Sequence, residues 1–188
     1  MYLIGGTGRL LISEQNNALV IRLNSDGSLD KTYGDNGFFI KNWGADFTTL
    51  TEGVIVERDL YVVGMGFPTN TGFGIFAKID EEGALDNGFG INGRVLLSSE
   101  YENVNTIAQQ NEEHILIAAS YGDDRNAGIA RFDLDGNLDG AFGQDGLVVL
   151  DFGEREIQTA MEVDPIDNGI YVAGYTNCLL YTSPSPRD

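Results

Sequence analysis

The chain has 188 residues with 29 acidic and 11 basic side chains, so its formal net charge is −18 at pH 7. This charge argues against partners such as nucleic acid or an anionic membrane surface, because both require a basic footprint. No stretch approaches the roughly 18 apolar residues of a membrane-spanning helix, and we expect no membrane insertion. The 25 glycines, together with many aromatic and β-branched residues, indicate short strands joined by tight turns.

One sequence frame occurs three times, at residues 25–37, 80–94 and 134–146. Each copy contains a turn glycine, a leucine, an aspartate, an aromatic residue and two further glycines in the same order. The turn glycines Gly27, Gly83 and Gly136 are separated by 56 and then 53 residues. Periods of this length are typical of blades or solenoid turns, in which each unit buries its apolar face against its neighbours.

Strand patterns divide each period in the same way. An apolar strand phrase opens the chain at 1–6 and recurs at 59–64, 114–119 and 169–174. In the middle repeat, four segments predict strands, namely 60–64, 73–79, 94–98 and 103–110. Four strands per unit is the number in a propeller blade.

We therefore predict an all-β fold of β-propeller-like blades, each with four antiparallel strands and with helix confined to single turns. The expected domain covers residues 1–177, in repeat units of roughly 5–63, 64–118 and 119–173. Because a propeller closes with about four to eight blades, about three repeats predict an incomplete propeller fragment.

The recurring loop predicts its own internal contacts. Each aspartate precedes the aromatic residue by three positions, a spacing at which its side chain can accept backbone N–H bonds and cap a single helical turn. The aromatic ring is expected to fill the gap between neighbouring units. A basic residue lies eight positions before each aspartate, which predicts one ion pair inside each unit. The signature residues are Arg22, Asp30 and Tyr33 in the first copy, Lys78, Asp86 and Phe89 in the second, and Arg131, Asp139 and Phe142 in the third.

Residues 178–188, CLLYTSPSPRD, match no part of the repeat. They resemble the translation of a transposon-end sequencing adapter, and we expect a non-native tail that does not continue the blades. A natural Pro/Ser-rich linker is the alternative. Since the only cysteine, Cys178, lies in this segment, cysteine usage does not indicate the redox compartment.

The motifs together resemble the delta-60 type repeat, a bacterial β-propeller repeat of about this period. The matching phrases are ARF at 130–132, VAG at 172–174, DGSLD at 26–30, DGNLD at 135–139, and the Phe-Gly pairs at 89–90 and 142–143. Tyr33 in place of Phe, Lys78 in place of Arg and Ala119 in place of Gly are mild departures. The resemblance implies a secreted or cell-surface location and supplies no established catalytic residues.

Oxygen-bearing side chains alternate in the segment DLDGNLD, which is similar to a Ca²⁺-binding loop. The glycine falls at the wrong position and no bidentate Glu follows at the expected distance, so a hairpin turn explains the pattern more simply. We expect no metal, no cofactor and no catalytic residue, with Ca²⁺ binding as the alternative. The weak metal candidates are Asp133, Asp135, Asn137 and Asp139.

The single histidine, His114, has no nucleophile or carboxylate partner in the repeat pattern, so we do not interpret it as catalytic. Two function classes remain. The first is a non-enzymatic scaffold that presents its loops to an extracellular protein or glycan. The alternative is part of a propeller enzyme, such as a polysaccharide lyase or hydrolase, whose active site lies in other blades. The loops of the three copies remain alike, which favours the non-enzymatic scaffold.

Overall fold

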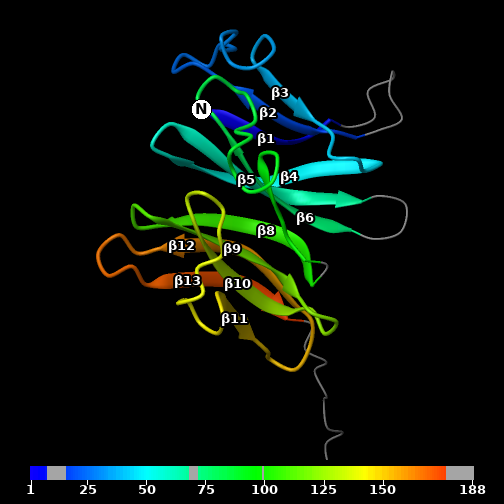
Figure 1. Ribbon diagram of the computed structural model, residues 1–188, viewed down its shortest axis with the longest axis vertical. Helices are drawn as coiled ribbons and strands as arrows, with labels where there is room; N and C mark the ends of the chain where they lie inside the picture. The colour runs from blue at the N-terminus through cyan, green and yellow to red at the C-terminus, as the bar shows by residue number, and fades with distance from the viewer. Residues whose placement is uncertain (8–15, 68–71, 99, 177–188) are drawn as a thin grey trace, which may run out of the picture.

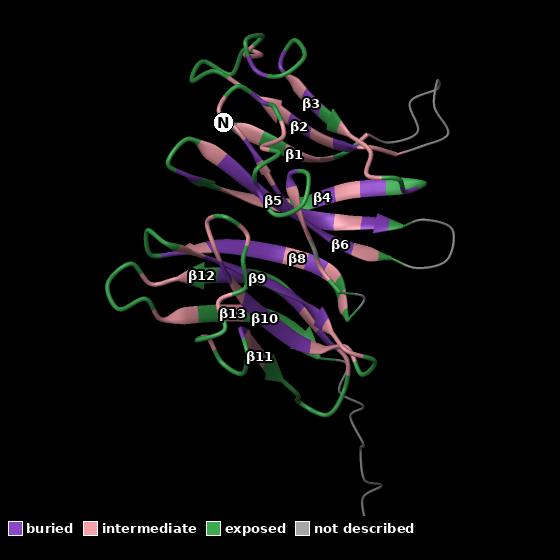
Figure 2. Ribbon diagram, in the orientation of Figure 1, coloured by how far each residue is buried: buried purple, intermediate pink, exposed green. Residues whose placement is uncertain are grey.

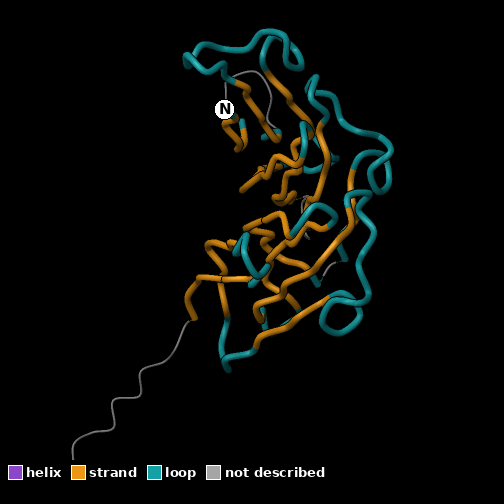
Figure 3. Tube along the Cα trace, turned by 90° about the vertical axis from the view of Figure 1, so that its left-hand side faces the viewer, coloured by secondary structure: helices purple, strands orange, loops and turns teal. Residues whose placement is uncertain are grey.

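The computed structural model describes residues 1–7, 16–67, 72–98 and 100–176, and the regular structure of these residues is entirely β-strand (Figure 1). In this part of the chain no helix has the length and apolar character needed to cross a membrane. The strands form four antiparallel sheets that follow one another along an arc, with loops gathered on its outer side (Figure 3). The all-β prediction is confirmed.

The two middle sheets are complete four-stranded blades, and each runs in chain order. The second sheet contains β4 (Phe47–Val56), β5 (Asp59–Phe67), β6 (Phe73–Ile79) and β7 (Arg94–Leu96). The third sheet contains β8 (Tyr101–Gln110), β9 (His114–Tyr121), β10 (Asn126–Asp133) and β11 (Leu147–Leu150). These sheets show the predicted blade, and we refer to them as the second and third blades.

The outer two sheets contain part of the same pattern. The first sheet contains β1 (Tyr2–Gly6), β2 (Ala18–Arg22) and β3 (Phe38–Lys41). The fourth sheet contains β12 (Glu156–Val163) and β13 (Ile170–Thr176). Because β1 and β13 carry the same strand phrase as β5 and β9, the first sheet corresponds to the last three strands of a blade and the fourth sheet to the first two.

The blades are offset from the expected repeat units. The links between sheets lie at 42–46, 97–100 and 151–155, whereas units of 5–63, 64–118 and 119–173 divide the chain inside β5 and β9. The sheets therefore repeat at the same spacing as the expected units, but each sheet begins at a different point of the repeat. β5 pairs with both β4 and β6, and a repeating sequence does not indicate which of two flanking strands begins a sheet.

The central strands are buried on both faces, which explains their nearly continuous apolar sequences (Figure 2). Leu60 and Val62 of β5 pack toward the first sheet, while Tyr61 and Val63 pack toward the third blade. In β9, Ile115 faces the second blade, and the alternate residues pack toward the fourth sheet. Three apolar layers result, which we call the first, second and third joints in chain order. Buried members are Val20, Tyr33, Leu60 and Ile75 in the first joint, Tyr61, Phe76, Phe89 and Phe132 in the second, and Leu116, Ile129 and Met161 in the third.

The first strands of neighbouring blades are tied directly to one another. The Thr51 hydroxyl donates to the carbonyl of Val104 at 2.9 Å, and the N–H of Ile107 donates to Glu52 Oε2 at 3.0 Å. Thr51 and Glu52 lie at a register shift in β4, and β8 and β12 have register shifts in their central parts too. The shift releases Thr51 from regular pairing, and its side chain then bonds across to the next blade.

Candidate functional site

The recurring loop joins the third and fourth strands of each blade. We name residues 23–37, 80–93 and 134–146 the first, second and third signature loops. Their aspartates close the turn locally, because Asp30, Asp86 and Asp139 each accept a hydrogen bond at Oδ1 from the N–H two residues later, at 3.0, 2.9 and 3.0 Å. The loops are turns without a helical segment. Each aspartate side chain therefore closes a turn by accepting the N–H of the residue two positions later, and it does not cap a helix.

All three expected ion pairs are present. The Nε of Arg22 lies 2.8 Å from Asp30 Oδ2, and the Nζ of Lys78 lies 3.1 Å from Asp86 Oδ2. In the third copy, Arg131 Nη2 lies 2.6 Å from Asp139 Oδ2. The two aspartate oxygens are therefore divided between a backbone N–H and a cation in every copy.

In the second and third copies, the first residue of the blade's second strand also contacts the ion pair, a role that the repeat pattern did not assign to it. Asp59 opens β5, and its carboxylate lies 3.0 Å from Lys78 Nζ. His114 occupies the same position in β9, with its Nε2 3.5 Å from Asp139 Oδ2. The structure thus supplies the carboxylate neighbour that the pattern lacked for His114, although this carboxylate already binds Arg131. The alignment of Asp59 with His114 was the only signal in the sequence.

The protonation equilibria of these groups follow from the contacts. Hydrogen bonds from the Gly88 N–H and then from Lys78 lower the pKa of Asp86. The Ala141 N–H and then Arg131 lower the pKa of Asp139 in the same way. Both carboxylates are held ionised by groups that consume their acceptor positions, which suits a structural ion pair better than proton transfer.

The signature aromatics differ in burial although they share one sequence frame. Tyr33 is fully buried and Phe89 is 1% exposed, whereas Phe142 is only partly buried. Tyr33 and Phe89 lie under the turn glycine of the following loop: a methyl group added to Gly83 would lie 2.9 Å from Tyr33 Cδ2, and one added to Gly136 would lie 2.9 Å from Phe89 Cε2. The expected filling of gaps between units holds for these two rings. For Phe142, no described loop lies in the corresponding place.

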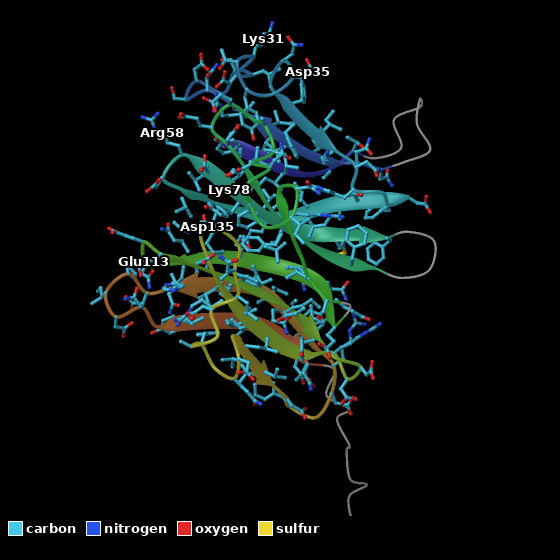
Figure 4. All side chains as sticks on the ribbon, viewed as in Figure 1. Lys31, Asp35, Arg58, Lys78, Glu113 and Asp135 are labelled. Atoms are coloured by element: carbon cyan, nitrogen blue, oxygen red, sulfur yellow. The ribbon has the colours of Figure 1, made fainter. Side chains whose placement is uncertain are left out.

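The weak metal candidates lie at the end of β10 and in the third signature loop, and Asp133 is hydrogen-bonded to two of the others, Asp135 and Asn137. Asp133 Oδ1 accepts the N–H groups of Asp135 and Asn137 at 3.0 and 2.8 Å, and its Oδ2 accepts from Asn137 Nδ2 at 2.9 Å. Asp139 is bound to Arg131. Within the described ranges, no three His, Cys, Asp or Glu side chains are grouped as a metal site would require. The geometry is that of a hydrogen-bonded turn. Figure 4 shows Asp135 on the same side of the molecule as Lys78, Arg58 and Glu113.

A groove between the second and third blades lies beside the third signature loop and has a volume of about 710 Å³. Its aromatic side is formed by Tyr101 and Tyr121, whose ring centroids are 5.2 Å apart at an interplanar angle of 71°. The Tyr121 hydroxyl donates to Glu100 Oε2 at 3.0 Å, and burial, with Tyr121 and Glu100 nearby, raises the pKa of Tyr101 to about 12. Polar and apolar groups of the third signature loop and β11 complete the lining, among them Leu138, Gln144, Asp145, Leu147 and Val149.

The repeat pattern did not indicate this groove. Tyr101 and Tyr121 stand outside the signature frame, at the start of β8 and the end of β9. Antiparallel pairing sets them opposite each other. A sequence signal existed only in the form of two tyrosines flanking a predicted strand pair.

Comparison with known families agrees with the blade architecture. A family model described as "Domain of unknown function (DUF5122) beta-propeller" matches residues 1–33. This stretch is similar to a β-propeller repeat. It contains β1, β2 and the first part of the first signature loop through Tyr33. The chain has no match among curated proteins and none among solved structures.

Proposed function

We propose that this β-propeller repeat segment is a non-enzymatic binding or structural scaffold of a secreted or cell-surface protein, with repeats of the delta-60 type. The observation that carries the proposal is that the carboxylates of the signature loops are already bound to groups of their own blade. In each signature loop the aspartate binds a backbone N–H and a cation of the same blade. These polar groups hold the loop in shape and leave the groove as the surface for a partner.

The partner that fits the groove best is a glycan. Sugar rings present C–H faces that pack on aromatic side chains, and their hydroxyls bond to carboxylates and amides. The groove combines the rings of Tyr101 and Tyr121 with the acceptors Glu100 and Asp145. Its volume of about 710 Å³ is within the usual range for small-ligand sites.

A binding experiment tests both parts of the proposal. The full chain would be titrated calorimetrically with a panel of soluble oligosaccharides, and the best binder repeated with Tyr121→Ala. We expect at least about a tenfold loss of affinity. Tyr171→Ala is the matched control, because Tyr171 is 63% exposed on β13 and lies outside the groove. Equal effects of the two substitutions, or no binding by any oligosaccharide, would contradict the glycan assignment.

The alternative, a segment of a propeller enzyme that acts on polysaccharides, makes a different prediction. Incubation of the same oligosaccharides with the protein would then release new reducing ends or unsaturated products. We expect none, and product formation that is lost with Tyr121→Ala would overturn the non-enzymatic reading.

Residues 178–188 lie outside the described residues. We propose that they are a non-native tail, in line with their resemblance to a translated adapter. Removing them is then expected to leave the midpoint of thermal unfolding unchanged in calorimetry, and a clear decrease would contradict the proposal.

A further inference from the structure

Four asparagines of the chain are followed directly by glycine, a pair that favours loss of the asparagine amide. The backbone nitrogen of the glycine can attack Cγ of the asparagine, because glycine has no side chain to obstruct closure of the ring. All four asparagines are exposed to water, so exposure does not rank them. They are Asn36, Asn87, Asn92 and Asn168.

The hydrogen bonding of the glycine N–H distinguishes these four sites. A bonded N–H gives up its proton less readily, and a carboxylate acceptor opposes formation of the amide anion further. Three of the glycines donate to an oxygen: Gly37 to the Tyr33 carbonyl at 2.7 Å, Gly88 to Asp86 Oδ1 at 2.9 Å and Gly169 to Asp167 Oδ1 at 2.8 Å. For Gly93, no acceptor lies among the described residues. The nitrogen that follows Asn92 is therefore the most available nucleophile of the four.

The turn that contains Asn92 is also held by fewer hydrogen bonds than the same turn in the other two signature loops. In the first and third loops, the last glycine donates to the carbonyl of the signature aromatic, and the next residue donates across the turn. These bonds run from Gly37 to Tyr33 and from Phe38 to Asp35, at 2.7 and 3.2 Å, and from Gly146 to Phe142 and from Leu147 to Gln144, at 2.8 and 3.1 Å. Among the described residues of the second loop, neither equivalent is formed, and the turn is closed by the bond from the Ile91 N–H to the Arg94 carbonyl at 2.7 Å.

The contact between this turn and the neighbouring strand is weaker in the second loop as well. The basic residue of each copy donates its backbone N–H to the carbonyl of the last glycine. The donor–acceptor distance is 3.5 Å from Lys78 to Gly93, compared with 3.3 Å from Arg22 to Gly37 and 3.1 Å from Arg131 to Gly146. The second turn is thus the least firmly attached of the three.

A weakly held turn matters because ring closure requires the backbone to move. Asn92 and Asn36 both have φ of +53°, the left-handed conformation of a two-residue hairpin turn. Bringing Cγ to the next backbone nitrogen requires the turn to leave this conformation. The rate of reaction then follows how often each turn opens, and turns with fewer hydrogen bonds open more often.

We propose that Asn92 is a site of spontaneous deamidation. A base removes the amide proton of Gly93, and the nitrogen forms a bond to Asn92 Cγ while the Cγ–Nδ2 bond breaks and ammonia leaves. Water then adds to one of the two carbonyls of the resulting succinimide, and the ring opens to aspartate or isoaspartate. One amide and one water become one carboxylic acid and one ammonia, and ionisation of the acid adds one negative charge to the chain.

The two products differ in how well they fit the loop. Aspartate is compatible with it, because Asp145 occupies the corresponding position of the third loop with the same φ of +53°. Isoaspartate adds one carbon atom to the backbone of the turn, where Gly93 packs directly against the Leu85 side chain. The extra atom strains the second signature loop, which also holds Phe89 in the second joint. Isoaspartate at position 92 is therefore expected to weaken the packing between the second and third blades.

Peptide mapping by mass spectrometry tests the proposal on the full chain, stored folded at neutral pH. We expect a mass increase of about 1 Da at Asn92, with isoaspartyl and aspartyl forms separated by chromatography. This reaction should be at least about fivefold faster than at the other three asparagines, a factor that corresponds to one hydrogen bond of about 1 kcal/mol. In concentrated urea the four sites should react at similar rates, because the folded turns no longer distinguish them.

Two variants complete the experiment. Asn92→Asp should abolish the fast mass increase and leave the circular dichroism spectrum and the midpoint of thermal unfolding unchanged. Asn36→Asp is the matched control, and it should leave the fast reaction at Asn92 intact. Reaction of another asparagine as fast as Asn92 in the folded chain would overturn the proposal, as would an unmodified Asn92 in the folded chain or the same ranking of sites in urea.

Discussion

The second and third joints show what buries a signature aromatic. In the second joint Phe89 is 1% exposed, with its ring centroid 5.0 Å from that of Phe76 and 5.6 Å from that of Tyr61. In the third joint the equivalent Phe142 is only partly buried, with β12 and β13 as the described strands on that side. The two rings occupy the same position in the repeated sequence frame, in the second and third signature loops. Burial is therefore a property of the following repeat, as expected where each unit contacts only its neighbours.

Truncating the two rings should produce the largest difference between these joints. Phe89→Ala removes a fully packed ring and is expected to lower the free energy of unfolding by about 3–5 kcal/mol. Phe142→Ala removes a ring that water already reaches, and a loss of about 1 kcal/mol or less is expected. Urea unfolding followed by fluorescence and circular dichroism gives both values. Similar losses in the two variants would show that the third joint is packed as tightly as the second.

The turn glycines provide the next comparison. Gly27 and Gly136 have nearly the same φ, +84° and +86°, so alanine at either position costs about 1–2 kcal/mol of backbone strain. Only at Gly136 does the added methyl group also meet the Phe89 ring, at 2.9 Å. This overlap adds about 1–3 kcal/mol. Gly136→Ala is therefore expected to be the more destabilising variant in the same urea experiment, and equal losses would refute the role of Gly136 in covering Phe89.

The ion pairs are expected to have the smallest effect, and one that depends on pH. The folded-state pKa of Asp86 is below its ordinary value of 3.8, so its contribution is present above pH 3.8 and is lost as pH falls through the lower, folded-state pKa. Asp86→Asn should remove the share of the acid-induced loss of stability that comes from Asp86. This share is expected to be less than about 1 kcal/mol of unfolding free energy, because solvent screens the pair.

The exposed pair of Arg58 and Glu81 is the control for that experiment. The Arg58 side chain is 77% exposed, and its Nη1 lies 3.0 Å from Glu81 Oε2. Arg58→Gln is therefore expected to change the free energy of unfolding by at most about 0.5 kcal/mol. Urea unfolding at a series of pH values from neutral to about pH 3 measures both variants. A larger effect for Arg58→Gln would reverse the assigned ranking of the two pairs.

Much of the blade could be predicted because its information is local and repeated. The segment 73–79 was expected as a strand and forms β6 with the same bounds. The offset of eight residues between Arg22 and Asp30 reflects a hairpin turn that returns the chain to its own strand, so the ion pair follows from spacing alone. The roles of Asp59 and His114 were not predicted, because they depend on pairing between strands rather than on the loop.

The all-β class, the repeat period, the loop frame and the ion pairs could all be predicted from the sequence, since each depends on residues close together in the chain or on their repetition. Which strands share a sheet could not be predicted in this way, because it depends on packing between blades. In β5, residues on both faces are apolar because blades pack on both sides, so its pattern favours neither neighbour. The tertiary structure also decided that Tyr33 and Phe89 are covered while Phe142 is not, because the loop that covers each ring comes from the next repeat.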